Sequence, residues 1–219
     1  MSRTSTLLGL LLIFAGSAQL LAQSPRPVPR SAMKAGFDVT NPAFPSLGRA
    51  DAPVAIVEFS EFGCPYCRRH ASDVLPLLLE KYVNAGEVRY FFVQLPPDGE
   101  RSSEIGAIAL LCAAQANATL PMYQLLFQGA EIDRRKIDAA AAALGLEAAS
   151  FARCENSAHT QAQLLSHRNM ARQSKVFGTP TFFIARVRNG RLVDAQATFG
   201  IKTVDYFESM VARLLKDGS

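Results

Sequence analysis

Two cysteines one helical turn apart, Cys64 and Cys67, follow directly after a β-forming apolar run at residues 54–59. A strand that leads into a helix whose first turn carries a C-x-x-C motif is the layout of a dithiol redox site. Unpaired N–H groups and the positive end of the macrodipole at a helix N-terminus stabilise a thiolate, so we expect a lowered pKa for Cys64. Cys67 lies on the same helix face and can attack a mixed disulfide held by Cys64. The sequence therefore predicts Cys64 as the nucleophile and Cys67 as the resolving thiol, with Pro65 and Tyr66 between them.

The C-x-x-C motif has two other uses, a zinc site and a structural disulfide. A structural zinc needs four ligands, and neither Cys112 nor Cys154 has a close Cys or His partner in the sequence. A structural disulfide across so short a loop constrains few residues and stabilises little. We therefore favour the redox dithiol and expect neither a metal nor a cofactor. For want of a four-ligand set, we also expect the three histidines to be solvated: His70, His159 and His167.

Residues 1–22 have the pattern of an export signal. Arg3 is followed by an apolar stretch at residues 7–15, and small residues then offer cleavage points after Ala18 or Ala22. A membrane anchor is the alternative, but the apolar stretch ends by Ala22 and is shorter than a spanning helix needs. The sequence therefore predicts an exported protein, and the exact signal cleavage site stays open.

The composition is that of an ordinary globular protein: of 219 residues, 49% are hydrophobic and 19% are charged, and the formal net charge is +4. No dense basic stripe alternates with aromatic residues, so we expect no nucleic-acid partner. Export to an oxidising compartment makes an even number of cysteines compatible with two disulfides. If Cys64 pairs with Cys67, Cys112 is left to pair with Cys154. The alternative is two buried free thiols that pack as small apolar side chains.

The predicted elements follow the order βαβ, a helical insertion and ββα. Residues 23–48 are rich in proline and poor in large apolar side chains, so we expect an extended leader. Strand signals in 49–100 flank one helix, whereas 101–176 has helical periodicity and no strand signal. Residues 177–219 contain a hairpin around Asn189-Gly190 and a closing amphipathic helix. We therefore predict an α/β domain, 49–100 with 177–219, that is interrupted by an all-helical domain, 101–176.

Several motifs together resemble the DsbA-like branch of thioredoxin-fold proteins, which are exported bacterial thiol-disulfide oxidoreductases with a helical domain inserted in the fold. The resemblance covers roughly residues 45–215. It rests on Leu47-Gly48, on Ala52-Pro53-Val54 leading into Val57-Glu58-Phe59-Ser60, on Cys64-Pro65-Tyr66-Cys67, and on Gly178-Thr179-Pro180-Thr181. It implies a thioredoxin fold with an inserted helical domain. The placement of Cys112 and Cys154 is similar to that in a subgroup with a second, structural disulfide.

The resemblance also implies roles for three residues outside the C-x-x-C motif. Pro180 is expected to be a cis proline beside the active site, with the backbone of Thr179 able to pair with a substrate strand. An ordinary turn is the alternative. Glu58 is expected to be the buried carboxylate beneath the site, where burial would raise its pKa and let it exchange protons with Cys67. Because residues alternate along a strand, Glu58 can instead face solvent.

We therefore expect a monomeric, periplasmic thiol-disulfide oxidoreductase that oxidises unfolded or reduced exported proteins and is reset by a membrane redox partner. A relative with histidine in place of Tyr66 would carry extra positive charge beside Cys64, so this chain is expected to be the weaker oxidant. An isomerase or reductase of the same fold is the main alternative, although residues 23–48 are too few for the N-terminal dimerisation domain of the dimeric isomerases. A thiol protein that binds a soft metal such as copper(I) is a further alternative.

Overall fold

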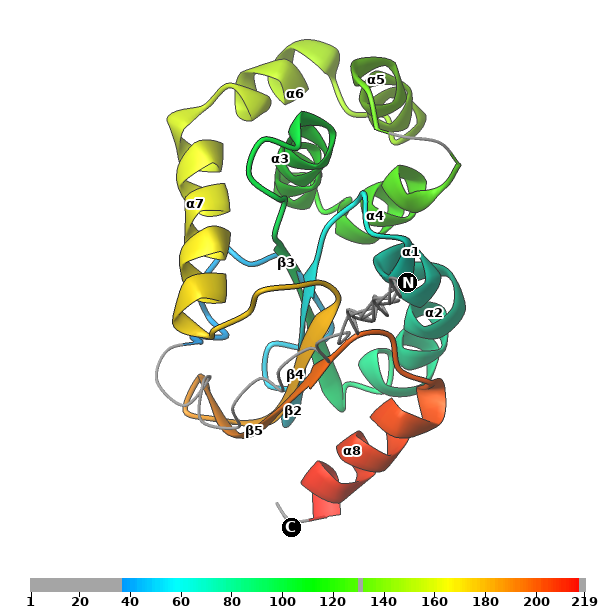
Figure 1. The fold of residues 1–219 in the computed structure, drawn as a ribbon, viewed down its shortest axis with the longest axis vertical. Helices are drawn as coiled ribbons and strands as arrows, with labels where there is room; N and C mark the ends of the chain where they lie inside the picture. Colours follow the sequence, from blue (N-terminus) through cyan, green and yellow to red (C-terminus); the bar gives the residue numbers. More distant parts are fainter. Residues whose placement is uncertain (1–36, 130–131, 217–219) are drawn as a thin grey trace, which may run out of the picture.

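The structure is a computed structural model, which describes residues 37–129 and 132–216 (Figure 1). The expected signal peptide, residues 1–22, and the first part of the expected leader, residues 23–36, lie outside the described residues. No helix of the described part is long and apolar enough to cross a membrane.

A five-stranded sheet in the order β1-β3-β2-β4-β5 forms the centre of the fold. The strands are β1 (Ser46–Leu47), β2 (Val54–Ser60), β3 (Val88–Gln94), β4 (Thr181–Arg188) and β5 (Arg191–Phe199). The middle strand, β2, is parallel to β3 and antiparallel to β4. All seven residues of β2 are buried, because both faces of the sheet are covered. The C-terminal end of β2 points to the dithiol.

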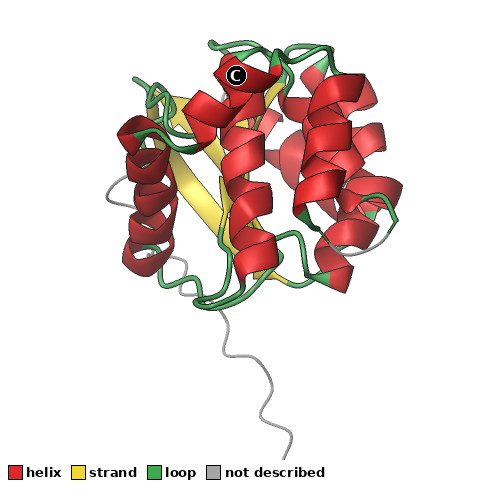
Figure 2. Cartoon of the chain, turned by 90° about the horizontal axis from the view of Figure 1, so that it is seen from above, coloured by secondary structure: helices red, strands yellow, loops and turns green. Residues whose placement is uncertain are grey.

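Helices lie on both sides of the sheet (Figure 2). One face packs against the helical segment that follows Cys64 and against the last helix. These elements are α1 (Pro65–Arg69), η1 (His70–Val74), α2 (Leu75–Leu78), η2 (Leu79–Val83) and α8 (Val204–Lys216), of which η1 and η2 are π-helical turns. The other face packs against residues 37–44 and the end of α7 (Ala158–Gln173). Val54 and Ile56 belong to the first core, so strand alternation puts Glu58 on the face that also carries Cys67.

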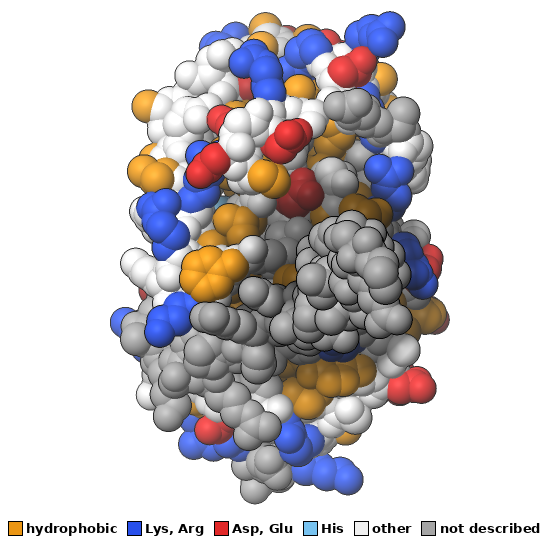
Figure 3. All heavy atoms as spheres, viewed as in Figure 1, with side chains coloured by type: hydrophobic (Ala, Val, Ile, Leu, Met, Phe, Trp, Pro, Cys, Tyr) orange, Lys and Arg blue, Asp and Glu red, His pale blue; other side chains and the backbone are white. Residues whose placement is uncertain are grey.

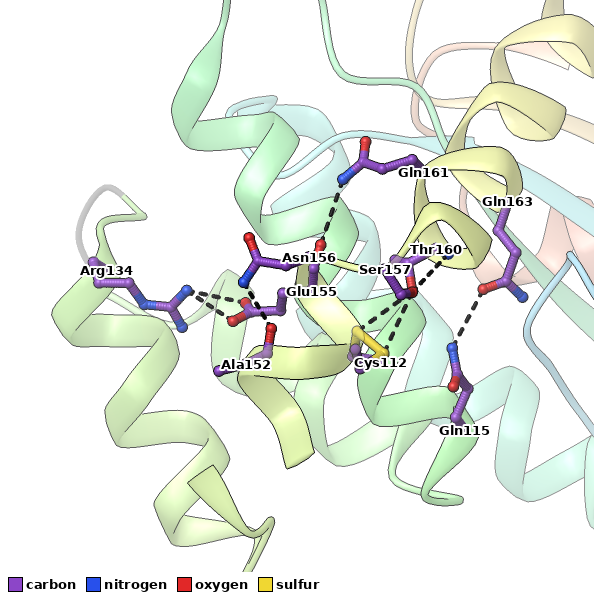
Figure 4. The surroundings of a disulfide bond; sticks show 11 residues. Cys112, Gln115, Arg134, Ala152, Glu155, Asn156, Ser157, Thr160, Gln161 and Gln163 are labelled. Carbon is purple, nitrogen blue, oxygen red and sulfur yellow. Dashed lines mark hydrogen bonds and ion pairs between the residues drawn. A yellow bond between two sulfur atoms is a disulfide. The ribbon is translucent and has the colours of Figure 1, made fainter. Parts of the chain in front are cut away.

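The helical insertion lies between β3 and β4 in the chain; most of it lies beyond one end of the sheet in space, and its last helix runs back alongside the sheet (Figure 1). Its helices are α3 (Arg101–Gln115), α4 (Thr119–Phe127), α5 (Arg134–Ala143), α6 (Ala148–Glu155) and α7. A disulfide between Cys112 and Cys154, with an S–S distance of 2.11 Å, joins α3 to α6 (Figure 4). The hydroxyl of Thr160 lies 3.8 Å from Cys112 Sγ and 3.4 Å from Cys154 Sγ. The predicted fold class, a thioredoxin fold with an all-helical insertion, is thus confirmed.

The folded part begins earlier than residue 49, where the sequence analysis placed its start. Phe37, Val39 and Phe44 are buried against the sheet, and β1 pairs antiparallel with β3. The ring of Phe37 lies 4.9 Å from that of Phe44 and 5.1 Å from that of Phe91. Three large apolar residues in eight positions are enough to bury a short segment, even though prolines surround them. Residues 37–48 are therefore part of the packed fold rather than an extended leader.

Two of the three histidines are buried, which corrects the expectation that all are solvated. His70 and His167 are 0% exposed, whereas His159 is exposed as expected. His167 Nδ1 accepts from the Gln94 backbone N–H over 2.8 Å, and Nε2 donates to the Ala43 carbonyl oxygen over 2.7 Å. Burial lowers the pKa of His167 to about 4 and that of His70 to about 3. Both rings are therefore neutral at neutral pH.

Candidate active site

Cys64 lies at the start of the helix that follows the central strand. It is the N-cap of α1, with an extended backbone at φ −77° and ψ 118°, and Pro65 fills the first helical position, where a missing N–H costs no hydrogen bond. The Cys67 backbone N–H donates to Cys64 Sγ over 3.4 Å. Both cysteines are free thiols; Cys64 is 8% exposed and Cys67 is 0% exposed. A reactant from solvent therefore reaches Cys64 before Cys67.

The two thiols have opposite pKa shifts. The pKa of Cys64 is lowered to about 6, chiefly because the Cys67 side chain donates a hydrogen bond to the Cys64 sulfur, and the backbone N–H groups of Cys67 and Tyr66 lower it further. Burial raises the pKa of Cys67 well above its ordinary value, and the neighbouring Cys64 and Glu58 add to that effect. At neutral pH the pair therefore holds a thiolate on Cys64 and a proton on Cys67.

The loop that leads into β4 lies against Cys64. In its thiol form Cys64 donates a hydrogen bond to the Thr179 carbonyl oxygen over 3.5 Å, and the Thr179–Pro180 peptide bond is cis. Thr181 Oγ1 donates to the Gly178 carbonyl oxygen over 2.7 Å. This hydrogen bond joins the two ends of the segment that contains Thr179 and Pro180. The structure thus brings Thr179 and Pro180 beside the dithiol from a distant part of the chain.

Glu58 lies beneath the dithiol on β2 and is 0% exposed. The hydroxyl of Tyr90 donates to Glu58 Oε2 over 2.8 Å, and the hydroxyl of Tyr123 donates to both carboxylate oxygens over 3.0 Å. Ser60 Oγ lies 3.3 Å from the Tyr123 hydroxyl. Burial raises the pKa of Glu58 to about 7, although the hydrogen bonds from Tyr90 and Tyr123 oppose this rise. The carboxyl is therefore close to half-ionised at neutral pH.

Sequence reasoning missed three residues of this site: Tyr90, Tyr123 and His70. His70 Nε2 lies 2.8 Å from the Tyr90 hydroxyl. The burial of His70 near the site could have been predicted from the sequence, because a residue three positions after Cys67 lies on the same helix face. Tyr123 lies 65 positions from Glu58, and nothing local connects the two positions. Glu61, three positions before Cys64, is half-buried and accepts hydrogen bonds from the Gly63 backbone N–H and Ser103 Oγ.

The surface beside Cys64 combines apolar and charged side chains. Tyr66 is 55% exposed and Phe177 is 89% exposed. A hollow of about 360 Å³ at Thr179 is lined by apolar residues such as Leu95, Val176 and Phe177 and by four charged ones: Glu61, Asp98, Arg168 and Arg172. On the face drawn in Figure 3, the coloured Lys and Arg side chains are scattered among apolar and acidic ones. Within residues 37–129 and 132–216, no group of three or more His, Cys, Asp or Glu side chains is placed to hold a metal ion.

A family model described as Thioredoxin matches residues 40–200. The chain belongs to the thioredoxin family. Among curated proteins that are similar to this chain, the probable disulfide bond formation protein D of Bacillus cereus is 47% identical over 64 residues, which are 29% of this chain and 29% of that protein. A putative protein-disulfide oxidoreductase of Rickettsia felis is 23% identical over 154 residues, 66% of this chain and 54% of that protein. The match thus spans about three tenths of the length of the Bacillus relative.

Solved structures place this thioredoxin-family chain among DsbA-like folds. Alpha-DsbA1 of Wolbachia pipientis is 21% identical with a TM-score of 0.71, over 81% of this chain and 93% of that one. The catalytic domain of Proteus mirabilis ScsC is 25% identical with a TM-score of 0.69, over 85% of this chain and 98% of that one. The resemblance to the DsbA-like branch, inferred from the motifs, is therefore confirmed.

Proposed function

We propose that this protein is an exported thiol-disulfide oxidoreductase that introduces disulfides into reduced exported proteins. The observation that carries the proposal is the asymmetry of the dithiol. Cys64 has a lowered pKa and is 8% exposed, whereas Cys67 is 0% exposed and protonated. Such a pair can exchange with an external thiol at one sulfur and resolve the product with the other.

The proposed reaction has two exchange steps. A substrate thiolate attacks Cys64 Sγ in the oxidised protein; a substrate–Cys64 disulfide forms, and the Cys64–Cys67 bond breaks. Cys67 leaves with the electron pair and takes a proton, which Glu58 is placed to supply. A second substrate thiolate then attacks the substrate sulfur of the mixed disulfide and expels Cys64 as a thiolate. The substrate dithiol loses two electrons, and the protein disulfide gains them.

The oxidising direction is supported by the lowered pKa of Cys64. A stabilised thiolate favours the reduced protein, and this makes its disulfide the stronger oxidant. The reduced protein then needs an external acceptor, for which we propose a membrane redox partner. In that reset, Cys64 attacks the partner's disulfide and Cys67 resolves. Isomerase or reductase activity of the same dithiol is the alternative that the experiment must separate.

Two further parts of the proposal rest on separate observations. The half-buried Thr179 lies beside Cys64, so its backbone is placed to pair with the extended strand of a substrate. Apolar side chains around it, such as Phe177, provide contact area for unfolded chain. Export rests on the pattern of residues 1–22, and we propose a monomer that works in the periplasm.

A redox titration against glutathione, combined with two refolding assays, tests the function. Oxidised protein should restore activity to a reduced, unfolded disulfide-containing substrate, and Cys64→Ser should abolish this. Cys67→Ser should accumulate a mixed disulfide between Cys64 and substrate, which mass spectrometry detects. Activity on a scrambled substrate without added oxidant would instead favour an isomerase. Tight copper(I) binding by the reduced protein without any exchange would favour a soft-metal binder.

A further inference from the structure

Two tyrosines from different parts of the fold bind the same buried carboxylate. Tyr90 comes from β3 in the sheet, and Tyr123 comes from α4 in the helical insertion. Both residues are 0% exposed, and both donate their hydroxyl hydrogen to Glu58, over 2.8 Å and 3.0 Å. The insertion therefore contributes a polar group directly to the chemistry beneath the dithiol.

The hydroxyl of Tyr123 is not needed for packing. Its ring lies 4.7 to 5.7 Å from three phenylalanine rings, those of Phe62, Phe92 and Phe127. Phenylalanine would fill this aromatic cluster equally well and would bury no polar atom. The hydroxyl instead reaches Glu58 and Ser60. What it adds is an interaction with the carboxylate.

His70 fixes the direction of the second hydrogen bond. Tyr90 has one hydroxyl hydrogen, which goes to Glu58, so the contact of 2.8 Å between His70 Nε2 and the Tyr90 oxygen requires that His70 donates. His70 remains neutral, because burial lowers its pKa to about 3. A donor behind Tyr90 strengthens the hydrogen bond in front of it. The chain His70, Tyr90, Glu58 therefore favours the ionised carboxylate.

The groups that face Glu58 come from every element packed around it. Cys67 belongs to α1 and Cys64 is the N-cap of that helix. His70 belongs to η1, and the two tyrosines belong to β3 and α4. Strand β4 places Phe182 opposite Glu58, and this residue neither titrates nor donates. No cation among the described residues forms a salt bridge with Glu58, so hydroxyl donors offset its burial.

We propose that Tyr90 and Tyr123 are positioning residues that keep Glu58 ionised often enough to accept the proton of Cys67. The inference rests on the proposed function, in which Cys67 resolves a mixed disulfide. In that step the Cys67 S–H bond breaks and its proton goes to a Glu58 oxygen. Cys67 Sγ then attacks Cys64 Sγ, and the partner sulfur leaves with the electron pair of the broken disulfide as a thiolate. The protein dithiol loses two electrons, which the partner gains.

The test measures the resolution step as a function of pH in Tyr123→Phe and Tyr90→Phe. A mixed disulfide of reduced protein with glutathione is formed at Cys64 at low pH and is then transferred to a series of higher pH values. Because the chain has no tryptophan, the decay is followed by acid quench and mass spectrometry. Tyr82→Phe, another buried tyrosine, is the matched control. Circular dichroism and thermal unfolding verify that each variant is folded.

We expect the midpoint of the pH profile to move to higher pH by roughly 1 in each tyrosine variant, because a hydrogen bond to a charged group is lost. A shift of that size lowers the ionised fraction at pH 7, and with it the rate, by about fivefold. The rate should recover above the new midpoint, which a merely structural defect would not produce. Tyr82→Phe should keep the midpoint of the unaltered protein.

An unchanged midpoint in both folded tyrosine variants would overturn the inference. If Tyr123→Phe does not fold, Tyr90→Phe alone decides, since it removes the other donor to the same carboxylate. The proposed function fails separately, namely if the unaltered protein forms no mixed disulfide at Cys64 or does not resolve it. A midpoint that disappears in Glu58→Gln but stays in place in both tyrosine variants would retain the function and refute the role of the hydroxyls.

Discussion

Replacing Glu58 by glutamine should make the protein more stable at neutral pH while it slows thiol exchange. Burial raises the pKa of Glu58 from 4.5 to about 7 in the folded state. In the unfolded chain the carboxyl ionises near its ordinary value. Between these two values the unfolded state releases a proton that the folded state keeps. The unfolded state is therefore increasingly favoured as the pH rises.

The size of this effect follows from the two pKa values. Below pH 4.5 Glu58 is protonated in both the folded and the unfolded state, so it causes no loss of unfolding free energy. The loss grows as the pH rises and is complete above about 7. A difference of 2.5 in pKa corresponds to about 3 kcal/mol of unfolding free energy. Glutamine has nearly the same shape and cannot ionise. Glu58→Gln should therefore gain up to about 3 kcal/mol over the parent between pH 4 and pH 8.

Urea unfolding at a series of pH values, monitored by circular dichroism in the dithiol form, measures this difference. The parent and the variant share every other titrating group, so the difference in their unfolding free energies isolates Glu58. A difference that stays constant from pH 4 to pH 8 would refute the reasoning, because it would mean that Glu58 ionises in the folded state as readily as in water. The same variant should lose the pH midpoint of mixed-disulfide resolution near 7.

Three further predictions concern other parts of the molecule. Tyr66→His should lower the pKa of Cys64, read from thiolate absorbance, and should make the protein a stronger oxidant in the glutathione titration; an equal or higher pKa would contradict this. Joint replacement of Cys112 and Cys154 by serine should reduce the unfolding free energy by at most about 4 kcal/mol, since the bridge closes a loop of 42 residues, while exchange at Cys64 continues. As the pH falls from 6.5 to about 4, His167 takes up a proton in the unfolded state but stays neutral in the folded state, so the unfolding free energy should decrease by about 3 kcal/mol. In His167→Gln, urea unfolding should show a flatter pH dependence of stability over this range.

Most of the fold could be predicted from local patterns in the sequence. The apolar run before Cys64, the Asn189-Gly190 turn and the helical periodicity of residues 101–176 each predict an element that the structure contains. Phe37 and Phe44 were overlooked because prolines dominate their surroundings, and only the assembled sheet gives these two rings a surface to cover. Burial of His167 was also readable, since Leu164, Met170 and Ala171 recur on the same face of α7.

Thr179 and Pro180 were predicted from the family resemblance of Gly178-Thr179-Pro180-Thr181, but the rest of the site was predictable only where its residues are close in the chain. Cys64 and Cys67 are joined by the geometry of a single helical turn, and Glu58 is one strand away. Tyr90 lies within an apolar β-run that has no polar signature of its own, and Tyr123 belongs to an insertion whose packing on the sheet no local pattern defines. Hydrogen bonds between positions so far apart depend on tertiary packing, which periodicity does not report.

The Tyr123 contact also limits how freely the two halves of the chain can evolve apart. An inserted helical block would ordinarily be an exchangeable module, because it is joined to the rest of the chain at two points. Here residue 123 and residue 58 share a hydrogen bond, and Phe62, just before the dithiol, packs on the rings of Tyr123 and Phe127. A chimera that receives residues 101–176 from a relative without this hydroxyl would contain a folded insertion, but its Glu58 would lack a hydrogen bond and have a higher pKa. Across homologues, we therefore expect these two positions to covary.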